Sequence, residues 1–400
     1  MIAASCLLGP ACSAGVDTHT TTLTRTLVPG IKTSASFDWV EIDQSAHRLY
    51  ATDRSDVGVD VFDVSKVPAT YVTTVALPAT PNGLAVAPEI HRVFAGLSDG
   101  TVQFIDTTTE KVVNQVASGT NSIDLIEYAA QKHAVYAANG GGKVVVVDVD
   151  KAATRSVFNF GPHTIEQPRY NPGDGLLYVA SPDEDGVLVV DPDTGAVKNK
   201  LPFGACRGHG MAIDPKHNMA VIACSSWVIR QNLHDPSDQK GFPQVSGGDI
   251  VTYDAKVDRF FVGSPDAKPS EVAVLGGNPI DFVAVVTTGG FGNSAAYDET
   301  NDMVYTPDIR KGEVGVIGFK RPTGDISLSS IPPVAIASTA ALFLAIVVIM
   351  FAIGRNGDPV RRPAPQPARR SSSSSSRREQ TAGEVRAGAR RWTRKVEPPG

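Results

Sequence analysis

A short β-type sequence recurs seven times in this chain of 400 residues, and it constrains the fold more than any other feature. Each copy begins with a large apolar residue and continues with aromatic, small or β-branched residues. The seven copies are Leu49–Thr52, Val93–Gly96, Val135–Ala138, Leu177–Ala180, Val221–Cys224, Phe261–Ser264 and Val304–Pro307. Successive copies are 44, 42, 42, 44, 40 and 43 residues apart. Such a nearly constant period is typical of a protein built from repeated supersecondary units.

Each copy lies in the same local frame of apolar runs and turns. A strand ending in a turn precedes it, as at Gly83–Pro88, and an alternating run such as Gly100–Asp106 follows. A fourth β-type run comes next, for example Lys111–Ala117. The 37 Gly and 28 Pro residues of the chain agree with many tight turns. Four short strands in about 42 residues predict one blade of a β-propeller.

The last repeat supplies only three strands before the chain passes Pro322. The segment Thr21–Val28 precedes the first repeat and has a β-type pattern, so we expect it to pair with the last blade and close the ring. Closure matters because an open propeller would expose unpaired strand edges. The sequence therefore predicts an all-β fold, a seven-bladed β-propeller over residues 20–321.

These repeats resemble the YVTN-type propeller repeat of bacteria and archaea. The shared pattern is a Pro-x-Gly turn, a strand ending in Asp-Pro, a sequence like Leu-Tyr-Val-Ala-Asn and a third strand ending in Asp, and residues 81–119 fit it best. The literal YVTN quartet is absent, and the segment between Ser225 and Gly247 departs most from the pattern. A WD-type propeller is the weaker alternative, because no Trp-Asp pair ends the third strands. The resemblance implies a fold and a location outside the cytoplasm.

The first strand of each blade lines the central channel of a propeller, so one repeated position near its start should form a ring around the channel mouth. Counting back eleven or twelve residues from each copy gives a polar residue in every blade. We call this set the mouth ring: Asp38, Asn82, Asp124, Glu166, His209, Asp249 and Asn293. Four clustered acids repel one another unless protons or a cation relieve them. The ring is suited to a divalent cation such as Ca²⁺, or to a cationic or polyhydroxylated ligand.

Cys206 and Cys224 flank the first hairpin of the fifth blade, which is expected to bring them close together. An oxidising compartment favours a disulfide between them. The alternative is a Cys2His2 site for Zn²⁺ or copper with His209 and His163, but it lacks the tight spacing of a zinc motif. For a metal in the ring itself, the candidate ligands are Glu166, His209 and Asp249.

Three segments outside the repeats predict a membrane protein. Residues 1–14 resemble a truncated secretory signal peptide. After a linker at 322–333, residues 334–353 form an uncharged apolar run long enough to span a bilayer as a transmembrane helix. The tail, 354–400, is rich in Arg, Ser and Pro and is expected to be disordered and cytoplasmic. This arrangement places the propeller outside the cytoplasm.

Charge argues against nucleic-acid binding by the propeller. Residues 355–400 hold 12 Lys or Arg and 4 Asp or Glu, whereas the whole chain holds 37 and 42, so the first 354 residues carry 25 basic and 38 acidic side chains. A domain this acidic lacks the basic surface that phosphate backbones require.

We therefore expect a membrane-anchored binding or scaffolding module for a protein, glycan or small ligand. The alternative is a metal-dependent hydrolase resembling propeller lactonases, with a cation held by Glu166, Asn82, Asn293 and Asp249 and with His209 or Asp38 as the base. No sequence motif for a catalytic nucleophile supports it.

Overall fold

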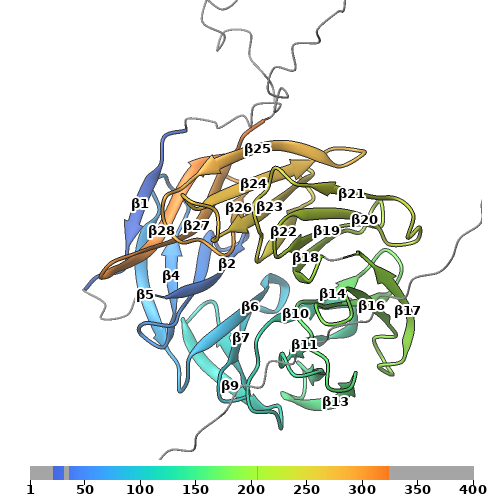
Figure 1. Cartoon of the computed structure of the whole chain (residues 1–400). Helices are drawn as coiled ribbons and strands as arrows, with labels where there is room; N and C mark the ends of the chain where they lie inside the picture. The colour runs from blue at the N-terminus through green and yellow to red at the C-terminus, as the bar shows by residue number, and fades with distance from the viewer. Residues whose placement is uncertain (1–20, 31–35, 205, 324–400) are drawn as a thin grey trace, which may run out of the picture. The chain divides into compact units, whose positions relative to one another are not determined.

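The computed structural model describes residues 21–30, 36–204 and 206–323. They form seven four-stranded antiparallel sheets arranged around a common centre, as Figure 1 shows. The innermost strands are β2 (Phe37–Asp43), β6 (Pro81–Ala87), β10 (Ile126–Ala129), β14 (Pro168–Asn171), β18 (Gly208–Asp214), β22 (Val251–Asp254) and β26 (Ala296–Asp298). The prediction of an all-β, seven-bladed propeller is thus confirmed.

The other strands follow outward in each sheet. The second strands are β3 (Arg48–Asp53), β7 (Arg92–Leu97), β11 (Ala134–Ala138), β15 (Leu176–Ser181), β19 (Met219–Cys224), β23 (Arg259–Ser264) and β27 (Met303–Arg310). The third strands are β4 (Gly58–Asp63), β8 (Thr101–Asp106), β12 (Lys143–Asp148), β16 (Gly186–Val190), β20 (Val228–Asn232), β24 (Glu271–Gly276) and β28 (Glu313–Lys320). The fourth strands are β5 (Thr70–Ala76), β9 (Lys111–Ala117), β13 (Ala153–Asn159), β17 (Val197–Pro202), β21 (Gln239–Phe242), β25 (Asp281–Thr287) and β1 (Thr24–Leu27). The recurring tetrapeptide lies on the second strand of every blade.

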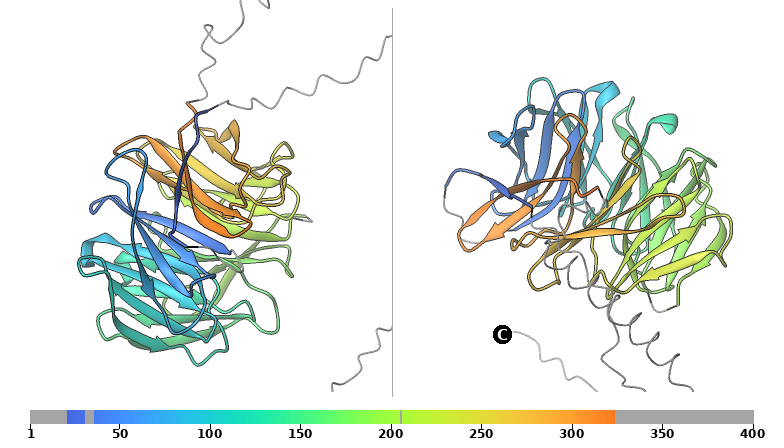
Figure 2. Two further views of the ribbon diagram at one scale, coloured as in Figure 1. Left: turned by 90° about the vertical axis from the view of Figure 1, so that its left-hand side faces the viewer. Right: turned by 90° about the horizontal axis from the view of Figure 1, so that it is seen from above.

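Strand β1 (Thr24–Leu27) closes the ring. It pairs antiparallel with β28, so the last blade takes its fourth strand from the start of the chain. Both views in Figure 2 show the blue N-terminal strand beside the orange C-terminal strands. Arg25 of β1 reinforces the junction by donating to the fully buried carboxylate of Asp308 at 2.5 Å. The closing strand predicted from the sequence is therefore present.

The apolar core is divided among the junctions between neighbouring blades. Seven clusters of buried residues correspond to the seven junctions. At the closure of the ring, Phe37 and Leu49 of the first blade pack with Tyr305 of the last. Because apolar burial is shared between adjacent sheets in this way, each blade depends on both neighbours for its stability.

A β-bulge recurs where the first strand of a blade begins, and it determines which residues face the channel. In blade four the N–H of Glu166 donates to Ala180 O at 2.9 Å, while the N–H of Ala180 donates to Gln167 O at 3.2 Å, so two residues oppose one. Blades three and six repeat this pattern, and β2, β6 and β18 show the matching register shift. Side chains of a regular strand alternate between its two faces, and the extra residue of a bulge shifts this alternation by one position. Residues three apart, such as Asp38 and Glu41, consequently face the same side.

The expected terminal segments are not described by the structure. Residues 1–14, 334–353 and 354–400 all lie outside the described ranges. Among the residues that the structure does describe, no helix is long and apolar enough to cross a membrane.

Candidate functional site

The mouth ring is held together by contacts between successive blades. Asn293 of the last blade donates its Nδ2–H to Asp38 Oδ1 of the first at 2.8 Å, and both residues are 7% exposed. Glu166 Oε1 of blade four lies 3.9 Å from His209 Nδ1 of blade five. The structure thus brings together ring members that are far apart in the sequence, while a ligand-binding role of the ring stays a prediction.

Backbone contacts fix the ring positions as well. The N–H of Gly210 donates to Asp249 O at 2.8 Å across the junction of blades five and six. A Cβ at Gly210 would lie 2.1 Å from that oxygen, so the blades can approach this closely only with glycine at this position.

Arg54 is a cation in this region that the sequence analysis did not identify. It follows β3 and donates to the Asp38 carboxylate and, at 3.0 Å, to Asn82 Oδ1. It also interacts electrostatically with Asp124 and Asp249. One guanidinium therefore partly compensates three carboxyl groups, those of Asp38, Asp124 and Asp249.

Burial and mutual repulsion keep the ring acids partly protonated near neutral pH. Burial, together with the charges of Asp124, Asp249 and Asp38, raises the pKa of Glu166 to about 8. Burial, with Asp38 and Asp124, raises the pKa of Asp249 to about 7. Burial also raises the pKa of Asp38 to about 6 against the opposing charge of Arg54, and it raises that of Asp124. Four acids from four blades therefore share one electrostatic field.

His209 does not neutralise this field. Burial lowers its pKa, and the nearby charge of Arg207 lowers it further, so the imidazole is neutral at pH 7. Its Nε2 lies 3.1 Å from Ser225 Oγ. His209 can therefore exchange a hydrogen bond with a ligand but adds no positive charge.

Across the ranges that the structure describes, no three His, Cys, Asp or Glu side chains lie close enough together to hold a metal ion. Glu166, His209 and Asp249 are therefore not grouped as three such ligands, and a Ca²⁺ site in the ring stays a prediction.

The two cysteines form a disulfide. Cys206, just before β18, is bonded to Cys224 at the end of β19, and both are buried in the junction of blades four and five. Because both sulfur atoms are used in this bond, the alternative Cys2His2 site is wrong. His163, its fourth proposed ligand, instead lies 3.4 Å from Glu184.

A second layer of polar side chains lies deeper in the channel. Arg169 of β14 donates from Nη1 to Glu127 Oε2 at 2.5 Å and from Nε to Met211 O at 2.7 Å. Its Nη2 donates to Val251 O at 3.4 Å, and its guanidinium carbon lies 5.5 Å from the centre of the Trp39 ring. Arg169 therefore contacts strands of blades one, three, five and six and crosses the channel.

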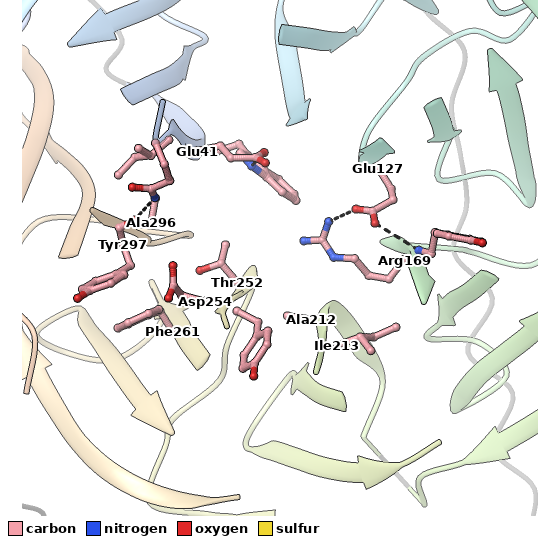
Figure 3. A pocket seen from close by; sticks show the side chains of 15 residues that line it. Glu41, Glu127, Arg169, Ala212, Ile213, Thr252, Asp254, Phe261, Ala296 and Tyr297 are labelled. Carbon is pink, nitrogen blue, oxygen red and sulfur yellow. Dashed lines mark hydrogen bonds and ion pairs between the residues drawn. The ribbon is translucent and has the colours of Figure 1, made fainter. Parts of the chain in front are cut away.

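A pocket of about 350 Å³ opens beside this layer, where the first strands end. We call it the channel-end pocket. Figure 3 shows Arg169 and Glu127 joined on one side of it, with Thr252 and Asp254 among the side chains around the remaining space. Its lining combines carboxylates with aromatic rings: Trp39, Glu41, Ile42, Gln44, Glu127, Arg169, Tyr170, Ala212, Ile213, Thr252, Tyr253, Asp254, Phe261, Ala296 and Tyr297.

The sequence contained a signal for this second layer. Glu41, Glu127 and Arg169 each lie three residues after a mouth-ring member, as do Ala212, Thr252 and Ala296. Because of the repeated β-bulge, the residue three positions after each ring member faces the channel. In a regular strand, the residue two positions later would face it. The bulge is not evident from the residue pattern, so these residues were missed.

Comparison with known proteins adds little to this picture. No protein-family model matches the chain. Part of the chain is similar to the pre-rRNA-processing protein IPI3 of Meyerozyma guilliermondii, with 27% identity over 156 residues. The match covers 38% of this chain and 29% of that protein, so the chain spans less than a third of its length. The YVTN-type relationship stays a prediction.

Proposed function

We propose that this propeller is a binding or scaffolding module whose mouth ring receives a basic group of a partner protein, the ammonium of a lysine or the guanidinium of an arginine. The observation that carries the proposal is the convergence of Asp38, Asp124, Glu166 and Asp249 from four separate blades onto a region where Arg54 is a neighbouring cation. Buried carboxylates that repel one another are stabilised by a cation that approaches them.

An organic cation suits the ring better than a metal ion does. The acids are close enough to raise one another's pKa, but their oxygens are not arranged as a ligand set. A guanidinium or ammonium group carries several N–H donors and can reach acceptors that are spaced more widely than metal ligands. The neutral side chains of Asn82 and His209 add hydrogen-bonding groups beside the charges.

Two features support a location at the outer surface of a membrane, which is part of the same proposal. The uncharged run at 334–353 is followed by a basic tail, a pattern that favours a membrane span with the tail inside. The Cys206–Cys224 disulfide suits an oxidising compartment.

Binding of a single-arginine peptide tests the proposal. The probe is a fluorescent peptide with one arginine between glycines, and its citrulline analogue has the same shape without the charge. We expect the full chain to prefer the arginine peptide and the double variant Glu166→Gln/Asp249→Asn to bind it at least about tenfold more weakly, a change of about 1.4 kcal/mol.

The matched control is Asp150→Asn/Asp193→Asn, which removes two acids whose side chains are 69% and 64% exposed on the rim. This control should bind the arginine peptide as the unmodified chain does. Equal weakening in both double variants would show that the peptide responds only to net charge, and the ring would lose its role.

A further inference from the structure

Glu41 is a carboxylate of the channel-end pocket that lacks a charged partner in direct contact. Its Oε2 accepts a hydrogen bond from Trp39 Nε1 at 3.3 Å, and a backbone hydrogen bond comes from Val86. Among the described residues, no Lys, Arg or His lies within ion-pair distance of it. Burial, against the opposing charge of Arg169 and with a smaller contribution from the charge of Glu127, raises the pKa of Glu41 to about 7.

The charge of Arg169 acts on Glu41 without a direct ion pair, and the contacts of Arg169 are made with other groups. Its Nη1, Nε and Nη2 groups donate to Glu127, Met211 and Val251, and its plane lies over Trp39. The pocket also contains the carboxylate of Asp254. The pocket thus contains three acids, Glu41, Glu127 and Asp254, and one guanidinium, which already donates to other groups. Carboxyl groups therefore outnumber basic groups in its lining.

The remaining wall is suited to an apolar group. Tyr170 and Tyr253 are half-buried and line the pocket beside the acids. An aromatic face next to a carboxylate is a favourable environment for an ammonium group and the hydrocarbon attached to it. A volume of about 350 Å³ lies at the lower end of the range for small-molecule sites.

We propose that the channel-end pocket binds a small organic molecule with a protonated amine, the ammonium group beside Glu41 and the apolar part against Tyr170 and Tyr253. This site is distinct from the mouth ring, because its residues lie one bulged step, three residues, further along the first strands. Because of the bulge, these three residues span only two residues of the neighbouring strand. At about 3.3 Å per residue of that strand, the two layers are roughly 7 Å apart.

Calorimetry with the full chain tests this inference, using phenylethylamine as the probe. Phenylethanol is its neutral analogue, and glucose represents a polyhydroxylated ligand. We expect phenylethylamine to bind, phenylethanol and glucose not to bind detectably, and Glu41→Gln to weaken phenylethylamine binding at least tenfold. The rim variant Asp150→Asn should bind it like the unmodified chain.

A second measurement applies even if the Glu41→Gln protein folds poorly. In the unmodified chain, the affinity for phenylethylamine should increase between pH 6 and pH 8, because Glu41 must lose its proton to pair with the ammonium while the amine stays charged. Binding that is independent of pH in this range would overturn the proposal, as would unchanged binding in a folded Glu41→Gln variant. Glucose binding without phenylethylamine binding would instead identify a carbohydrate site.

The two proposed sites can also fail separately. If Glu41 binds an amine as described, saturating phenylethylamine should leave the affinity of the arginine peptide for the mouth ring unchanged. Competition between the two probes would contradict the existence of a second, separate site.

Discussion

Replacing Arg169 with alanine is expected to lower the free energy of unfolding by about 3 kcal/mol, because the change leaves Glu127 buried without its partner. The side chains of Arg169 and Glu127 are only 15% and 17% exposed, so water cannot replace the lost contact fully. Chemical denaturation of the Arg169→Ala variant and the unmodified chain at pH 7.5 measures the difference.

Two further variants separate the ion pair from simple loss of packing. Arg169→Lys keeps the charge but not the three directed donations to Glu127, Met211 and Val251, so it should recover only part of the loss. The double variant Arg169→Met/Glu127→Met removes both charges and should be more stable than Arg169→Ala alone. A double variant that is less stable than Arg169→Ala would contradict this account.

Removing the disulfide should have an effect of similar size. In the variant Cys206→Ala/Cys224→Ala the free energy of unfolding is expected to fall by about 3 kcal/mol, since the bond closes a loop in the unfolded chain. The two cysteines are 18 residues apart and both are buried at the junction of blades four and five.

The measurement is denaturation of the double alanine variant beside the unmodified chain, each with and without a reductant. Reductant should bring the unmodified chain close to the variant and should leave the variant itself unchanged. A loss below about 1 kcal/mol would mean that the hairpin of β18 and β19 is held by its packing alone.

The repeat made most of the fold predictable from the sequence. The spacing of the tetrapeptides located the second strand of every blade, and the need to close the ring identified β1. Blade five was the least regular in sequence, yet Val228 and Ile229 still supply buried apolar side chains on its third strand, β20. Burial between neighbouring blades therefore determines strand formation even where the local pattern is weak.

The candidate site was only partly predictable. The mouth-ring positions followed from one repeated position, but the contribution of Arg54 depends on a long side chain that contacts Asp38 of its own blade and Asn82 of the next. Arg169 depends in the same way on partners in blades three, five and six. Contact sets of this kind belong to the assembled ring, because no single repeat contains all the partners.

Titration of the ring acids tests the central claim most directly. NMR of labelled carboxyl carbons, assigned by the loss of each signal in Glu166→Gln and Asp249→Asn, reports the pKa of each group. If the acids converge, Glu166 should titrate with a pKa of about 8 and Asp249 with a pKa of about 7. The substitution Asp249→Asn should then lower the pKa of Glu166. Ordinary values near about 4 for both groups, unaffected by the other substitution, would show that these side chains do not share one channel mouth.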